Sequence, residues 1–78
     1  MPSKVPRVTG EEAVKAFCAA GYALDRTTGS HKILKHPDRR ERLSIPVHAG
    51  KVLGVGLLRS QIKAAGLTVE EFTALLDT

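Results

Sequence analysis

Two capping boxes, one near each end of the chain, determine where helices can begin. Thr9 is followed three residues later by Glu12, and Thr68 is followed three residues later by Glu71. In a capping box each side chain accepts a hydrogen bond from the backbone N–H of the other residue, so two donors at an open helix end are satisfied. The sequence therefore predicts a helix directly after each of the two threonines.

Three helices follow from these boxes and from the glycines behind the apolar segments. The first is predicted over residues 10–20, because apolar side chains recur there at helical spacing and Gly21 can end it. The last is predicted over residues 69–76. A helix between them is expected to end at Gly66. Its apolar side is predicted to consist of Leu57, Leu58, Ile62 and Ala65.

The stretch between the first two helices has the pattern of a small antiparallel sheet. Short strands are predicted over residues 22–26, 31–36 and 42–47. The third has a clear alternation, in which Leu43, Ile45 and Val47 share one face. Turns are expected at residues 27–30 and 37–40, which contain Gly, Ser, Pro and Asp. The strands should therefore follow one another as a meander.

These elements give an α+β fold with the order α-β-β-β-α, a three-stranded antiparallel sheet and a short C-terminal helix. A chain of 78 residues has room for one core, so we expect a single domain over residues 8–78. Residues 1–7 contain two prolines and two basic side chains without periodicity, so we expect a flexible leader there. Pro46 has no amide hydrogen, which places it at a sheet edge or where pairing stops. Double-stranded-RNA-binding domains share this order of elements, although order alone is weak evidence of function.

Charge and composition narrow the class of partner and the compartment. The formal net charge is +4, which favours a polyanion such as nucleic acid, with an acidic protein as the second choice. Cys18 is the only cysteine, so an intrachain disulfide is impossible, and we expect its thiol to be buried. No apolar run approaches the roughly 18 residues of a membrane span, and we expect a cytoplasmic protein without a membrane partner.

The segment Gly29-Ser30-His31 is the most suggestive candidate for chemistry. A glycine and a small hydroxyl residue leave room for a phosphate to approach the imidazole. A neutral imidazole can take the proton from a ribose 2′-hydroxyl, which then attacks the adjacent phosphate. The alternative is that His31 is only a polar residue at a strand end.

The other two histidines are weaker candidates. His36 lies five positions after His31 on the same predicted strand, so the two side chains point to opposite faces and cannot share a metal ion. His48 follows the third strand, whose end an antiparallel hairpin brings near His31. His48 is therefore an auxiliary catalytic candidate, and no metal site is expected.

Basic residues surround the candidate histidine in sequence and are candidates for phosphate contacts. With the two small turn residues, the predicted RNA-binding set is Gly29, Ser30, Lys32, Lys35, Lys51, Arg59 and Lys63. The alternative is a solvated basic surface. The alternation does not decide which face carries the histidine, because His31, Ile33 and Lys35 form one mixed set and Lys32, Leu34 and His36 form another.

Over about residues 9–76 the chain resembles the HicA toxin family. The order and spacing of several short motifs carry the resemblance: Gly21-Tyr22, Gly29-Ser30-His31, Ile45-Pro46-Val47-His48, Gly50-Lys51, Gly56, Leu58-Arg59, Ile62, Ala65-Gly66-Leu67-Thr68 and Glu70-Glu71-Phe72. Two residues depart from the family pattern. Leu57 stands where the family often has a threonine that caps the second helix, and Gly54 is unusual in the preceding loop.

The resemblance implies a ribonuclease toxin of the mRNA interferase type, with a fold like that of double-stranded-RNA-binding domains. It implies that mRNA is cleaved without a metal or other cofactor, and that the one essential histidine maps onto His31. It also implies a HicB-like antitoxin protein that neutralises the toxin. A non-catalytic RNA-binding module and a protein-interaction module are the alternative functions.

Overall fold

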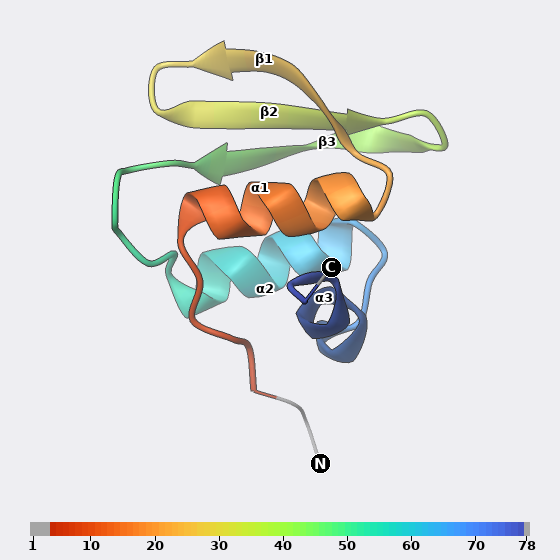
Figure 1. Cartoon of the computed structure of the whole chain (residues 1–78). Helices are drawn as coiled ribbons and strands as arrows, with labels where there is room; N and C mark the ends of the chain where they lie inside the picture. The colour runs from red at the N-terminus through yellow and green to blue at the C-terminus, as the bar shows by residue number, and fades with distance from the viewer. Residues whose placement is uncertain (1–3, 78) are drawn as a thin grey trace.

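The structure is a computed structural model that describes residues 4–77. Its order of elements, α-β-β-β-α-α, confirms the predicted fold class (Figure 1). The strands form one antiparallel sheet in the order β1-β2-β3, so β2 is central. The elements are α1 (Gly10–Ala19), β1 (Ala23–Thr28), β2 (His31–His36), β3 (Arg39–Pro46), α2 (Val55–Ala64) and α3 (Val69–Leu75).

Both predicted capping boxes are present. The Thr9 hydroxyl accepts from the Glu12 amide at 3.2 Å, and the Glu12 carboxylate accepts from the Thr9 amide at 2.9 Å. Thr68 and Glu71 make the same two hydrogen bonds at 3.0 and 2.8 Å. Because each box fixes a first turn, α1 and α3 begin at the predicted residues and end one residue earlier than predicted.

The start of α2 differs from the apolar pattern that predicted it. Gly54 is the N-cap and makes no side-chain cap hydrogen bond, so the helix begins at Val55. Leu57 falls in the first turn and is 39% exposed, which makes its predicted place on the apolar side wrong. Leu58 and Ile62 are buried as predicted, because residues four apart share one side of a helix.

Two strands differ from their predicted bounds because both turns are tighter than expected. β1 runs on to Thr28 and β3 begins at Arg39, so the turns consist of residues 29–30 and 37–38. β1 extends through Thr27 and Thr28 because threonine favours extended backbone. The first residues of β3 are charged, so the hairpin pairing with β2 places them in the strand, and apolar alternation does not. Only β2 has the predicted bounds, His31–His36.

Both long helices pack along β3. Pro46 is the last residue of this edge strand, as its missing amide hydrogen predicted. Its carbonyl oxygen lies so close to Gly10 that a Cβ there would clash with it, so α1 needs a glycine at its first residue. From α2, the Gln61 side chain accepts a hydrogen bond from the Ser44 amide at 3.3 Å. The β3 edge is therefore covered by helices.

The far edge of the sheet has no such cover. Figure 1 shows the helices below β3 and the strand β1 at the opposite edge of the sheet. β1 has no buried residue, and Leu24 on it is 50% exposed. β1 therefore extends beyond the helix layer.

The core lies between the sheet and the helices and is centred on Phe17. The ring centroid of Phe17 lies 5.0 Å from that of Phe72 and 6.1 Å from that of Tyr22. Leu34 and Leu43 close the core from the sheet and are fully buried. One helix from each end of the chain and the strands β2 and β3 thus share a single core.

Two residues lie in environments that the sequence did not predict. Val5, inside the expected leader, is only 8% exposed and packs in the core, so packing includes a residue before Val8. Cys18 is exposed, so its expected burial is wrong. Phe17 takes the core position on α1, and the side chain of the next helical residue, Cys18, points about 100° away from it.

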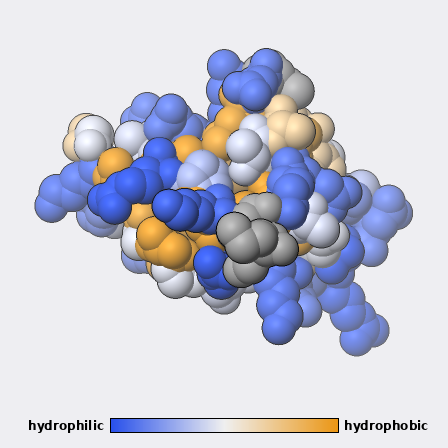
Figure 2. Space-filling view, turned by 90° about the horizontal axis from the view of Figure 1, so that it is seen from below, coloured by the Kyte–Doolittle hydropathy of each residue, from blue (hydrophilic) through white to orange (hydrophobic). Residues whose placement is uncertain are grey.

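Figure 2, viewed from the helix side, shows hydrophobic patches separated by hydrophilic side chains.

Candidate active site

His31 begins β2 directly after the turn of Gly29 and Ser30. Gly29 has φ +58°, a left-handed conformation that glycine adopts without steric cost. Nothing lies within 4 Å of the position that a Cβ would take there, so the space beside the turn is open. The His31 side chain is exposed. The turn therefore presents the imidazole with room for a ligand to approach.

The pairing register decides which face of the sheet carries His31. Leu34 pairs with Leu43, and both side chains are fully buried against the helices. Side chains alternate along a strand, so His31 lies on the opposite face together with Ile33 and Lys35. We call this surface the outer face. It is the face that the helices leave uncovered.

A carboxylate on the outer face pairs with two cations. The β1–β2 register shifts between Leu24 and Arg26, and Asp25 is the extra residue of this bulge. Asp25 Oδ2 lies 2.9 Å from Arg42 Nε, and its Oδ1 lies 3.7 Å from Lys35 Nζ. The two cations and the carboxylate together carry one net positive charge.

The predicted RNA-binding residues do not all reach the outer face. Lys35 does, but Lys32 pairs with the buried Ile45, so its half-buried side chain lies on the helix-facing side. Arg59 and Lys63 are exposed residues of α2 and belong to the helix layer. The structure therefore brings Lys35 onto the face of His31 and does not bring the other three there.

The loop after β3 lies beside the turn before β2. Val47 donates its amide hydrogen to the Ser30 carbonyl at 2.7 Å, just beyond the His31–Pro46 pair. His48 follows directly and is exposed, as is Lys51 further along the loop. This confirms the prediction that the end of the third strand lies near the start of the second.

His36 occupies the other end of β2 and has a packing role. Its ring centroid lies 5.0 Å from that of Tyr22, and its Nδ1 accepts a hydrogen bond from the Asp38 amide at 3.0 Å. Its Nε2 lies so close to Gly21 that a Cβ there would be 2.8 Å away. His36 therefore joins the β2–β3 turn to the end of α1, away from the glycine turn.

Sequence reasoning missed Arg26 as an outer-face cation. Arg26 pairs with Ile33 and Thr28 pairs with His31, so Arg26 is the diagonal neighbour of the histidine across the β1–β2 ladder. It is exposed, and within residues 4–77 it forms no ion pair. The observed turn consists of only Gly29 and Ser30, so Thr28 pairs with His31 and Arg26 lies diagonal to the histidine. The longer turn predicted over residues 27–30 does not give this pairing.

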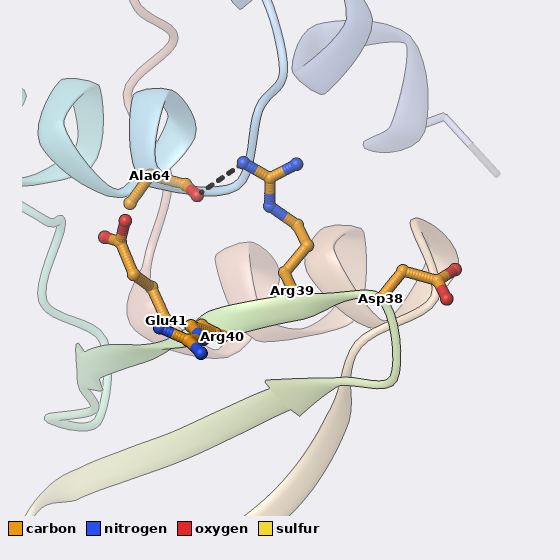
Figure 3. A pocket seen from close by; sticks show the side chains of 5 residues that line it. All are labelled: Asp38, Arg39, Arg40, Glu41 and Ala64. Carbon is orange, nitrogen blue, oxygen red and sulfur yellow. Dashed lines mark hydrogen bonds between the residues drawn. The ribbon is translucent and has the colours of Figure 1, made fainter.

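A hollow of about 250 Å³ lies beside the β2–β3 turn, at the end of β2 opposite to His31 (Figure 3). Its wall includes Arg39, whose Nη2 donates to the Ala64 carbonyl at 3.3 Å. Ala64 is the last residue of α2, where a cation satisfies free carbonyls and interacts well with the helix dipole. No histidine lines the hollow. The Arg39–Ala64 hydrogen bond joins the β2–β3 turn to the end of α2 there, which is a structural role.

Neither a metal-binding cluster nor a membrane-spanning helix is found in the described part of the chain. Residues 4–77 contain no group of three or more His, Cys, Asp or Glu side chains placed to hold a metal ion. Within the same residues, no helix combines the length and the apolar character that crossing a membrane requires. The candidate site is the outer face around His31, where the exposed imidazole lies beside the open glycine turn.

Comparison with known proteins gives a family that fits this site. The model of the HicA toxin of bacterial toxin-antitoxin systems matches residues 10–67, a range that runs from the start of α1 through the sheet to the residue after Gly66. A comparison with curated proteins gave no match. The family match covers more than half of the 78 residues and includes the turn, the histidine and the loop after β3. The chain belongs to the HicA toxin family of bacterial toxin-antitoxin systems.

Proposed function

We propose that this protein is a ribonuclease toxin of the mRNA interferase type and that His31 is its catalytic residue. The observation that carries the proposal is an exposed imidazole beside an open glycine turn, on the one face of the sheet that the helices leave uncovered. Family membership supports the same reading. The protein would act on mRNA in the cytoplasm.

The proposed reaction needs a base, a positioned phosphate and a proton for the leaving group. The neutral His31 imidazole takes the proton from a ribose 2′-hydroxyl, and the 2′ oxygen forms a bond to the adjacent phosphorus. The bond from phosphorus to the 5′ oxygen breaks, and that oxygen takes a proton from water or from His48. The products are a 2′,3′-cyclic phosphate and a free 5′-hydroxyl. No metal or other cofactor takes part in this scheme.

The turn and the nearby cations are proposed to hold the RNA. The Gly29 and Ser30 backbone leaves room for the phosphate. Lys35 lies on the same face as His31, four residues along β2, and Lys51 lies in the loop after β3. Cations at these positions offset the charge that grows on the phosphoryl oxygens. Lys32, Arg59 and Lys63 contact only RNA that continues around the sheet edge toward the helices.

A HicB-like antitoxin is proposed as the protein partner. The chain carries a formal net charge of +4, so an acidic partner fits it electrostatically. Covering the outer face would block access of RNA to His31. Inhibition would then need no change in the structure of the toxin.

Expression in bacteria with and without the antitoxin tests the proposal. The wild-type chain should arrest growth when expressed alone, and expression of the antitoxin encoded beside it should relieve the arrest. The His31→Ala variant, produced at the same level, should permit growth and should lack the RNA cleavage of the purified wild-type protein. Normal growth at verified wild-type expression would contradict the toxin function. RNA binding without cleavage would favour the non-catalytic module.

A further inference from the structure

The outer face carries a second basic residue whose surroundings differ from those of Lys35. On β1, Arg26 is two residues from Thr28, the direct partner of His31. Diagonal neighbours across an antiparallel ladder are about 7–8 Å apart, a distance that a long side chain can span. A phosphate close to the imidazole is therefore within reach of the Arg26 guanidinium.

The charges on this face make Arg26 different from its neighbours. Asp25 pairs with both Lys35 and Arg42, at 3.7 and 2.9 Å, so neither cation can move to a ligand without giving up that contact. Arg26 follows Asp25 directly in the chain, yet no ion pair joins it to any of residues 4–77. Its guanidinium is exposed and free to bind an anion.

We propose that Arg26 is a phosphate-binding residue of the RNA site and binds the phosphate next to the one whose phosphorus the 2′ oxygen attacks. This inference rests on the proposed ribonuclease function. A guanidinium can donate two parallel hydrogen bonds to one phosphate, which fixes both the position and the orientation of the chain. Arg26 then aligns the ribose and phosphate with the imidazole. Lys35 and Arg42, whose charges Asp25 partly neutralises, attract the RNA more weakly.

The test compares purified Arg26→Gln, Arg26→Lys and Arg7→Gln proteins. Arg7 is the matched control because it is an exposed arginine in the segment before α1, and Figure 1 shows this segment on the helix side of the molecule. A short single-stranded RNA of mixed sequence serves as substrate. Binding is measured by titration at several salt concentrations in the His31→Ala background, where the RNA stays intact.

Arg26→Gln should lower kcat/KM by about 10- to 100-fold, the loss expected when a hydrogen bond to a charged group is removed. It should also reduce the log–log salt slope of binding by about 0.7, the value for one phosphate contact to a single strand. Arg26→Lys should restore the slope but only part of kcat/KM, because an ammonium group lacks the paired donors. Arg7→Gln should match the wild-type protein on both measures.

The two proposals fail in distinguishable ways. If Arg26→Gln binds and cleaves RNA like the wild-type protein, Arg26 is a solvated surface residue and the inference is wrong. The inference is equally wrong if this variant loses affinity only for an acidic protein. If the wild-type protein binds RNA without cleaving it, the ribonuclease function fails, whereas a reduced salt slope in Arg26→Gln still supports the phosphate site.

Discussion

His31 pairs with Pro46 across the β2–β3 ladder, on the face of the sheet opposite to the buried pair of Leu34 and Leu43. The strand that carries the candidate catalytic residue therefore also carries a central core residue. Because side chains alternate along β2, the core residue Leu34 and the candidate catalytic residue His31 lie on opposite faces of the sheet. Substitutions on the two faces should consequently have different effects.

Truncation of Leu34 should destabilise the protein far more than a change at its neighbour. Leu34→Ala removes a fully buried side chain and should lower the free energy of unfolding by about 2–5 kcal/mol. Ile33→Thr, on the half-exposed outer face, should lower it by about 1 kcal/mol or less. Urea unfolding measures both. Equal losses would contradict the assignment of the faces.

The two-residue turn before His31 should depend on glycine. Gly29→Ala places a Cβ at φ +58° and should cost about 1–2 kcal/mol of unfolding free energy. Gly56→Ala is the matched control, because Gly56 lies within α2 with open space around it. That variant should be more stable than the wild-type protein by about 0.5–1 kcal/mol. Thermal unfolding of both variants should show shifts of opposite sign.

Removal of the Asp25 carboxylate should strengthen RNA binding. Asp25→Asn frees Lys35 and Arg42 and removes a negative charge from the outer face. The affinity for single-stranded RNA at low salt should rise about threefold, as expected for one unit charge about 7 Å from a phosphate in water. Glu11→Gln removes the same charge from α1 and should change affinity less. Equal changes in the two variants would show that only net charge matters.

The Tyr22 hydroxyl should contribute nothing to stability. It is buried, and within residues 4–77 its oxygen has no hydrogen-bond partner. Tyr22→Phe keeps the ring contacts with Phe17 and His36 and removes the cost of burying this hydroxyl. The free energy of unfolding should stay constant or rise by about 1 kcal/mol. A clear loss of stability in calorimetry would show that the hydroxyl is satisfied in solution.

Local signals in the sequence were sufficient for much of the fold. The capping boxes at Thr9 and Thr68 gave the starts of α1 and α3, and the glycines Gly21 and Gly66 have the positive φ angles expected at helix ends. The bounds of β2 were also correct. Each of these features depends on residues a few positions apart, which is the range over which sequence patterns are informative.

The rest depends on contacts between residues distant in sequence. Nothing local shows that the charged residues after Pro37 form a strand, or that Arg39 reaches Ala64 on α2. The face of His31 was undecided because both sets of alternating residues on β2 contain cations and an apolar residue. The pairing of Leu34 with the buried Leu43 on β3 decides it, and the separate register of β1 with β2 brings Arg26 to the site.

Single-turnover cleavage of RNA by His31→Ala, with His48→Ala measured beside it, tests the central claim most directly. His31→Ala should cleave about 10²- to 10⁴-fold more slowly, the usual loss for a general base. It should bind RNA normally, and its unfolding free energy should change by about 0.5 kcal/mol or less, because the side chain is exposed. His48→Ala should be impaired less. Cleavage by a folded His31→Ala protein at the wild-type rate would contradict the account and make His48 the leading candidate.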